Sequence, residues 1–359
     1  MTQSRNNRAI ISAAGSLKTQ FIIDEALAAP ASRRVLITTY TRENCDQISH
    51  RLQQAGGCIP PNIQVLSWFS LLMNQAARPY QSAVTGRMDY GRSLNFKPNP
   101  DMYASRKKQP LRYYFDRSGN FYRDTLADFV VEANSRTGGL VTRRLAGLFD
   151  AIYIDELQDL AGYDLDFLDL LFRSAIQVTV VGDPRQVTYT TNQSNRNKKY
   201  RGERIADWFE ERATKRVCTV EARTKSWRCN QDICDWADSL YPHLPQTVSQ
   251  NDARTGHDEV VCLARADVPT YVEKFQPTVL RWDRDSDTQG LPAMNFGLSK
   301  GSTFDRVLIF PPSTIVTYLI SKDVSKLKAK TLAHLYVAVT RARHSVAFVV
   351  DHKYADYTP

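Results

Sequence analysis

The chain has 359 residues, 42% of them hydrophobic and 24% charged, which is the length of about two domains and an ordinary globular composition. The formal net charge of +9 suits a polyanionic partner such as nucleic acid, or else a well-solvated basic surface. No apolar run approaches the ~18 residues of a membrane span, and residues 1–8 lack the apolar core of a secretory signal, so we expect a cytoplasmic protein without a membrane segment. The cysteines have no paired spacing, so we expect no zinc site.

Short apolar runs that end in small or acidic residues predict buried strands. In chain order these are Arg8–Ser12, Val35–Thr39, Ala151–Ile154, Val178–Val181, Glu259–Ala264, Thr278–Trp282, Arg306–Phe310 and Ser345–Val350. Helical patterns between them include Thr19–Ala29, Asn44–Gln54 and Tyr163–Phe172. Alternating strands and helices predict an α/β fold with parallel sheets covered on both faces, which bind ligands beyond the carboxyl ends of their strands.

The first candidate site is the segment 12–19, Ser-Ala-Ala-Gly-Ser-Leu-Lys-Thr, which follows a predicted strand and opens a predicted helix. Backbone N–H groups at a helix start favour phosphate, Lys18 would neutralise the β- and γ-phosphates, and the Thr19 hydroxyl would ligate Mg²⁺. The G-x-x-x-x-G-K-[ST] pattern has glycines where this chain has Ser12 and Leu17. We expect Leu17 to be tolerated with a negative φ and a side chain that points away from the nucleotide.

Two further elements follow predicted strands. Asp155 and Glu156 stand directly after Ile154, so one carboxylate can hold Mg²⁺ while the other orients or deprotonates water. Gln186 follows a Gly-Asp-Pro turn, where it could sense the γ-phosphate or position the attacking water. Either element alone is also compatible with an ordinary turn.

A basic and aromatic segment lies at about 78–123. It is predicted to contact nucleic acid or a partner through phosphates and stacked bases, the alternative being a solvated loop. Its basic residues are Arg87, Arg92, Lys97, Arg106, Lys107, Lys108, Arg112, Arg117 and Arg123, and its tyrosines are Tyr80, Tyr90, Tyr103, Tyr113, Tyr114 and Tyr122.

The phosphate loop, the acidic pair and the Gly-Asp-Pro-Arg-Gln turn, in this order, resemble the UvrD/Rep-like helicases of superfamily 1. Five further segments resemble the remaining motifs of that family: Thr39–Asn44, Val65–Phe69, Ser226–Arg228, Leu298–Asp305 and Tyr336–Arg343. The last, Tyr-Val-Ala-Val-Thr-Arg-Ala-Arg, is the most specific match. The resemblance therefore spans the chain from Ser12 to Arg343.

The resemblance implies an α/β fold of two RecA-like P-loop NTPase domains with parallel sheets, plus a small basic insert in the first. The implied bounds are 1–76 and 146–215 for the first domain, 77–145 for the insert and 216–359 for the second domain. The implied activity is ATP- and Mg²⁺-dependent translocation or unwinding on single-stranded DNA, with RNA and a nuclease or other protein as alternative partners.

The resemblance also implies residue roles. Glu156, Gln186, Arg228 and Arg341 would be catalytic, the two arginines acting as arginine fingers. Nucleotide would be bound by Ala14, Gly15, Ser16, Leu17, Lys18, Thr19, Trp227 and Gly301, with Trp227 stacking on adenine. Metal would be held by Thr19 and Asp155. Nucleic acid would be bound by Tyr40, Trp68, Arg106, Lys107, Lys108, Tyr189 and Lys300.

The chain departs from the family pattern at several points. Leu17 replaces a glycine, the glutamine that reads adenine upstream of the phosphate loop is missing, and Thr191 and Asn192 stand where an aromatic and an arginine are usual. The stretch between Arg228 and Lys300 is too short for the second-domain insert of UvrD and Rep. These departures favour an alternative: a nucleotide-binding nucleic-acid sensor, or subunit of a larger complex, with poor hydrolysis. A third reading, an RNA helicase of the viral superfamily 1 type, fits the last two motifs less well.

Overall fold

The computed structural model describes residues 6–99 and 104–354, so Tyr103 of the basic segment lies outside the described residues. The chain forms two compact units. The first comprises Met1–Ile11, Lys18–Pro184 and Tyr189–Glu221; the second comprises Ser12–Leu17, Arg185–Thr188 and Ala222–Pro359. No helix in the described part of the chain is long and apolar enough to cross a membrane.

The first unit is built on a six-stranded sheet with the order β3-β2-β6-β7-β1-β8. The strands are β1 (Arg8–Ser12), β2 (Val35–Thr39), β3 (Ile63–Ser67), β6 (Ala151–Ile154), β7 (Gln177–Gly182) and β8 (Thr219–Arg223). The ladders from β3 to β1 are parallel, with Ile37 opposite both Val65 and Tyr153. The predicted strands Arg8–Ser12, Val35–Thr39 and Ala151–Ile154 are confirmed at both ends.

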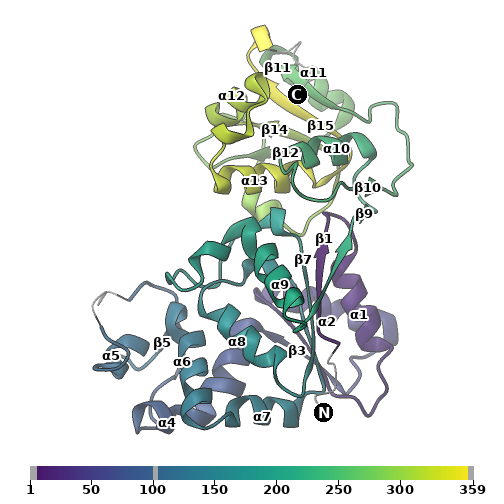
Figure 1. Ribbon diagram of the computed structural model, residues 1–359. Helices are drawn as coiled ribbons and strands as arrows, with labels where there is room; N and C mark the ends of the chain where they lie inside the picture. Colours follow the sequence, from purple (N-terminus) through teal and green to yellow (C-terminus); the bar gives the residue numbers. More distant parts are fainter. Residues whose placement is uncertain (1–5, 100–103, 355–359) are drawn as a thin grey trace. The chain divides into compact units, whose positions relative to one another are not determined.

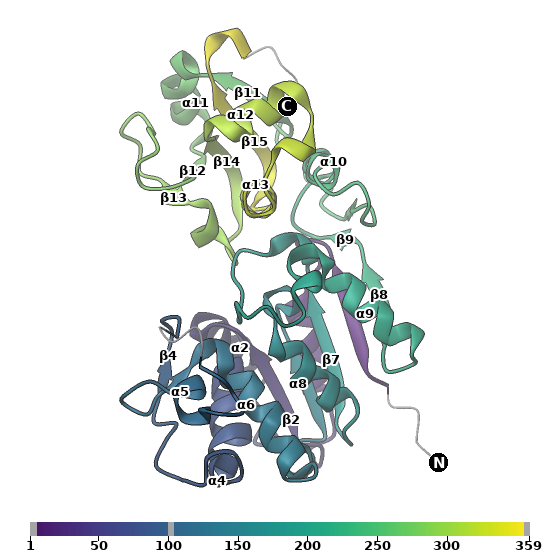
Figure 2. The ribbon, with the colours of Figure 1, turned by 60° about the vertical axis from the view of Figure 1, so that its left-hand side comes forward.

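Helices cover both faces of this sheet (Figures 1 and 2). On one face, α1 (Lys18–Leu27) and α2 (Arg42–Gly56) bury residues such as Ile22 and Leu52 against the strands. On the other face lie α6 (Arg123–Arg136), α8 (Tyr163–Phe172) and α9 (Ile205–Thr214). Because both faces are covered, the central strands are apolar on both sides, which is why they read as continuous hydrophobic runs.

The segment after β3 adds a largely helical layer to the first unit. It contains α3 (Trp68–Ser70), a π-helical turn (Leu71–Ala77), α4 (Gln81–Thr85), α5 (Pro110–Tyr114), α7 (Leu140–Leu148) and the short parallel pair β4 (Leu94–Asn95) and β5 (Phe121–Tyr122). Its aromatic residues Tyr114 and Phe121 both pack edge to face against Phe129 of α6, with ring centroids about 5 Å apart. Many of its aromatics therefore belong to the core.

The second unit contains a five-stranded parallel sheet with the order β11-β15-β14-β12-β13. Its strands are β11 (Val260–Ala264), β12 (Thr278–Arg281), β13 (Met294–Asn295), β14 (Phe304–Phe310) and β15 (Ala342–Val350). Its helices are α10 (Gln231–Ser239), α11 (Val268–Phe275), α12 (Ser313–Ser321) and α13 (Ala329–Val339), and separate apolar clusters cover the two sheet faces. The predicted α/β class with parallel sheets is therefore confirmed.

Candidate active site

The carboxyl end of β6 and the start of α1 come together in the first unit. Lys18 and Thr19 open α1, and the Thr19 hydroxyl donates to Oδ2 of Asp155 at 2.7 Å. Burial, followed by the nearby Glu156 charge, raises the pKa of the Asp155 carboxyl to about 6, while Lys18 opposes the shift. A hydroxyl paired with a buried carboxylate, beside a second carboxylate, is a set of hard oxygen donors that fits Mg²⁺.

Glu156 is held by its neighbours rather than by a regular element. Its backbone is left-handed, with φ 59°, and its N–H donates to Oδ1 of Asp155 at 2.9 Å. The Gln158 amide donates to the Glu156 carboxylate and accepts from the Asp183 N–H at 3.1 Å. A strained backbone fixed in this way is frequent at functional sites. Our sequence interpretation missed Gln158, although it stands two residues after the acidic pair.

The phosphate-loop residues 12–17 lie in the second unit, alongside the end of β8 and the segment that follows it. The Ala13 N–H donates to the Arg223 carbonyl at 2.8 Å, and the Trp227 N–H donates to the Gly15 carbonyl at 2.9 Å. Gly15 has φ 74°, and a Cβ there would lie 2.7 Å from Cβ of Arg228. Glycine is therefore required at position 15 both by its backbone conformation and by this close approach.

Leu17 departs from our expectation. Its φ is +57°, in the left-handed region, so the predicted negative φ is wrong. The side chain is 53% exposed, because the loop turns it outward instead of packing it. Position 17, where the motif has glycine, thus keeps the left-handed backbone that favours glycine. Because leucine has a Cβ, this conformation is sterically strained.

Trp227 lines a cavity of about 330 Å³ in the second unit. Its indole is 56% exposed, and Ser16 of the phosphate loop lines the same cavity. Ala14 is anchored nearby, since its N–H donates to the Tyr336 hydroxyl at 3.4 Å. The aromatic surface predicted to take the base is therefore open and adjoins the phosphate loop.

The second unit also brings together predicted catalytic residues from three motifs. Arg341 is 1% exposed, and its guanidinium donates to Oε1 of Gln186 at 3.1 Å and to the Val337 carbonyl at 3.0 Å. Arg228 donates to the Thr340 carbonyl, also at 3.0 Å. The glutamine and both arginines are thus held at one end of α13.

Lys300 and Gly301 lie close to Arg341 in that unit, since the Arg341 guanidinium donates to the carbonyl of Ser302, the next residue, at 3.4 Å. They follow the short helix Phe296–Ser299, and Gly301 has φ 91°, a conformation that favours glycine.

A row of four aromatic rings crosses the first unit beyond the carboxyl ends of β2 and β3. Ring centroids of Tyr189 and Tyr40 lie 6.4 Å apart, those of Tyr40 and Phe69 5.6 Å, and those of Phe69 and Phe96 5.8 Å. The two ends of the row are open, with Tyr189 43% and Phe96 57% exposed. Phe69 ends the motif-like segment Val65–Phe69, but our sequence interpretation assigned it no role of its own. Phe96 was missed, since it has no sequence signal beyond being an aromatic in a basic segment.

Trp68 requires a correction. It is 1% exposed, and its indole N–H donates to Oδ1 of Asp164 at 2.9 Å. Thr191 also donates to this carboxylate, and Asn192 donates to the Asp124 carbonyl at 2.7 Å. Trp68 therefore has no exposed ring face to offer a nucleic acid, and the departure at Thr191 and Asn192 serves the internal packing of the loop.

The three basic residues predicted to bind phosphates differ in their surroundings. Arg106 donates to Oδ1 of Asp128 at 2.7 Å, and Asp128 is fully buried. Lys107 and Lys108 are exposed. Removing the Arg106 guanidinium would leave a buried charge without its partner, so Arg106 has a structural role that the two lysines do not share.

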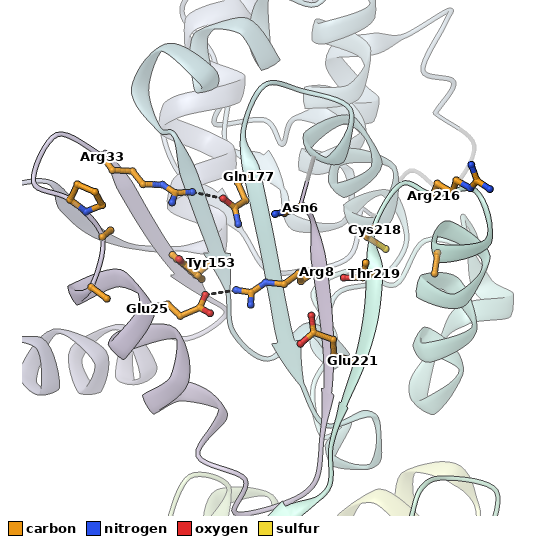
Figure 3. A pocket seen from close by; sticks show the side chains of 14 residues that line it. Asn6, Arg8, Glu25, Arg33, Tyr153, Gln177, Arg216, Cys218, Thr219 and Glu221 are labelled. Carbon is orange, nitrogen blue, oxygen red and sulfur yellow. Dashed lines mark hydrogen bonds and ion pairs between the residues drawn. The ribbon is translucent and has the colours of Figure 1, made fainter. Parts of the chain in front are cut away.

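A larger cavity of about 790 Å³ lies on the first unit, near the amino ends of β1, β7 and β8. Figure 3 shows Arg8 reaching from β1 to Glu25 of α1, and Arg33 paired with Gln177. Parallel sheets bind ligands beyond the carboxyl ends of their strands, so this cavity is at the opposite end from the phosphate-binding elements.

Comparison with known proteins gives one family match. Residues 111–198 match the model of the UvrD/REP helicase N-terminal domain. The matched segment contains Asp155, Glu156 and Gln186, and over this segment the resemblance to UvrD/Rep helicases is confirmed. No curated protein matches the sequence.

Solved structures similar to this chain include the arterivirus nonstructural protein 10 helicase, with 15% identity and a TM-score of 0.48. The same helicase in complex with DNA has 14% identity and a TM-score of 0.49. Each similarity covers 96% of this chain, but only 59% and 61%, respectively, of the viral chains. The chain thus spans about three fifths of their length.

Proposed function

We propose that this protein is an ATP-dependent translocase or helicase that acts on single-stranded DNA. The observation that carries the proposal is the network at the carboxyl end of β6, where the Thr19–Asp155 hydrogen bond adjoins Lys18 and Glu156. A phosphate-binding lysine, a hydroxyl–carboxylate pair and a second acid are the groups that phosphoryl transfer from ATP to water requires.

In this proposal each residue has a defined task. Thr19 and Asp155 hold Mg²⁺, which would neutralise charge on the phosphates, and Lys18 binds the β- and γ-phosphates. Glu156 accepts a proton from the attacking water, and Gln158 keeps its carboxylate oriented. Gln186, Arg228 and Arg341 respond to the γ-phosphate, the arginines by neutralising charge that develops on the phosphoryl group.

The Gln186–Arg341 hydrogen bond supports a link between sensing and catalysis. Both side chains are buried, so a shift of one requires the other to move or to lose its partner. Hydrolysis can in this way be converted into conformational change, which is the requirement for a motor.

The aromatic row from Tyr189 to Phe96 supports the nucleic-acid half of the proposal. The exposed rings at its two ends, Tyr189 and Phe96, can each stack on a base without sequence preference, at ~1–3 kcal/mol per base, while Tyr40 and Phe69 support them from within the row. Exposed Lys107 and Lys108 would add phosphate contacts, and we propose the same for Lys300.

The second candidate function is the hydrolysis-poor sensor, and the left-handed Leu17 is the observation that favours it. The two candidates are separated by measuring ATP hydrolysis with and without oligo(dT). The motor predicts turnover that rises at least ~10-fold with the oligonucleotide and depends on Mg²⁺. Turnover that stays at background under both conditions, while ATP still binds, would leave the sensor.

A further inference from the structure

The cavity beside Trp227 has a distinctive set of walls. It is lined by Ser16, Ala222, Arg223, Thr224, Lys225 and Trp227, all in the second unit. Its volume of about 330 Å³ lies at the low end of the ~300–1,000 Å³ typical of small-molecule sites. Under the proposed function, on which this inference rests, a nucleotide base stacks on Trp227 with its phosphates at the adjoining loop.

The polar side chains around this cavity are mainly donors. Arg223 and Lys225 can only donate hydrogen bonds, and the hydroxyls of Ser16 and Thr224 can donate or accept. Among these lining residues there is no amide and no carboxylate side chain. The backbone of Lys225 is fixed, because β9 (Lys225–Ser226) pairs in parallel with β10 (Val248–Ser249).

Purine bases differ in the groups that they offer to such walls. Guanine presents two adjacent acceptors, O6 and N7, which arginine and lysine recognise. Adenine presents an N6 amino donor beside N7, which asparagine and glutamine recognise by donating and accepting at once. Arg223 and Lys225 cannot accept from the adenine amino group, whereas either of them can donate to guanine O6.

We infer that this pocket does not select adenine and that it binds guanine and hypoxanthine nucleotides at least as tightly as ATP, with Lys225 as a specificity-determining residue. Stacking on Trp227 tolerates any base, so the preference rests on the donors at the edge of the ring. Inosine triphosphate is the informative probe, because it has guanine's O6 and N7 without the 2-amino group.

The test is competition of ATP, GTP and ITP against a fluorescent triphosphate, with Mg²⁺, on the full chain. We expect GTP and ITP to bind with affinities equal to or above that of ATP. Lys225→Gln should shift the GTP-to-ATP affinity ratio towards ATP by about 3- to 10-fold, the worth of one hydrogen bond at ~0.5–1.5 kcal/mol. Lys215→Gln, at an exposed lysine outside the cavity, should leave the ratio unchanged.

A tenfold preference of the wild-type chain for ATP over both GTP and ITP would overturn the inference, as would a Lys225→Gln ratio equal to that of Lys215→Gln. Lys225→Met, which removes the donor without adding an amide, should lower GTP and ITP affinity and spare ATP. Hydrolysis is measured separately. Purine-tolerant binding without turnover would defeat the proposed motor but not this inference. Turnover of ATP together with a tenfold binding preference for ATP would defeat this inference but not the motor.

Discussion

Replacement of Leu17 by glycine tests how the altered phosphate loop works. Leu17 combines a left-handed φ of +57° with a 53% exposed side chain, so its substitution changes backbone strain more than packing. Leu17→Ala is the matched control, because it removes the same side-chain contacts but keeps a Cβ. The difference between the glycine and alanine variants therefore isolates the cost of the left-handed backbone.

That difference can be estimated. A left-handed conformation costs a non-glycine residue ~1–2 kcal/mol, and glycine's extra freedom in the unfolded chain returns ~0.5–1 kcal/mol of this. Leu17→Gly should therefore be more stable than Leu17→Ala by about 0.5–1 kcal/mol if the fold holds the loop in this conformation. If the loop relaxes whenever nucleotide leaves, the strain appears in binding instead, as an ATP affinity up to about fivefold higher for glycine.

Urea unfolding and ATP titration of both variants together account for the strain. Equal stabilities and equal ATP affinities would refute the reasoning, because the strain would then appear in neither measurement. ATP turnover is measured separately, and we expect the wild-type protein, with Leu17 in place, to hydrolyse ATP. A wild type that is inactive with every nucleic acid, but active after Leu17→Gly, would support the sensor.

Three other predictions follow from the site. Glu156→Gln should lower ATP turnover by ~10²-fold or more while ATP binding persists; wild-type turnover would remove Glu156 as the base. Lys107 and Lys108 are replaced with alanine, while Arg106 is kept because it pairs with the buried Asp128. The double variant should bind all single strands more weakly, and the slope of log affinity against log salt concentration should flatten by roughly 0.7 per lost phosphate contact. An unchanged slope would show that the two lysines do not contact the nucleic acid. Burial raises the pKa of the Asp164 carboxyl to about 6, so between about pH 4 and 6 the native state retains a proton that the unfolded chain releases. The stability that this proton contributes is therefore lost as the pH rises through that range. In urea unfolding, Asp164→Asn should gain stability relative to wild type from about pH 4 to 6, and a difference in stability that stays constant with pH would refute the shift.

Much of the fold was predictable because the central strands are apolar on both faces. Val35–Thr39 and Ala151–Ile154 were found at their exact bounds, and the carboxyl ends of such strands pointed to the phosphate loop and to Asp155. β8 was not predicted, since this edge strand is mostly exposed and carries no continuous apolar run. Periodicity detects burial, so it finds core strands better than edges.

Side-chain environment was harder to predict than residue position. Trp68 lies next to Phe69 in sequence, yet Trp68 turns into the core against Asp164 while Phe69 joins the aromatic row. Arg106 and Lys107 are likewise adjacent, and only Arg106 has a buried acidic partner. A charged or aromatic residue in a motif-like segment thus has two possible environments, and only tertiary packing decides between them.

The most direct test of the proposed motor is ATP-driven arrival at the end of a single strand. Oligo(dT) of increasing length, labelled at one end with a fluorophore that reports the bound protein, is mixed with ATP and a trap for released protein. For a translocase, the fluorescence change at one labelled end should follow a lag whose duration increases in proportion to the length of the oligonucleotide. The Glu156→Gln variant should show no such length-dependent lag. A signal whose timing is the same for every length and for either labelled end would contradict the account.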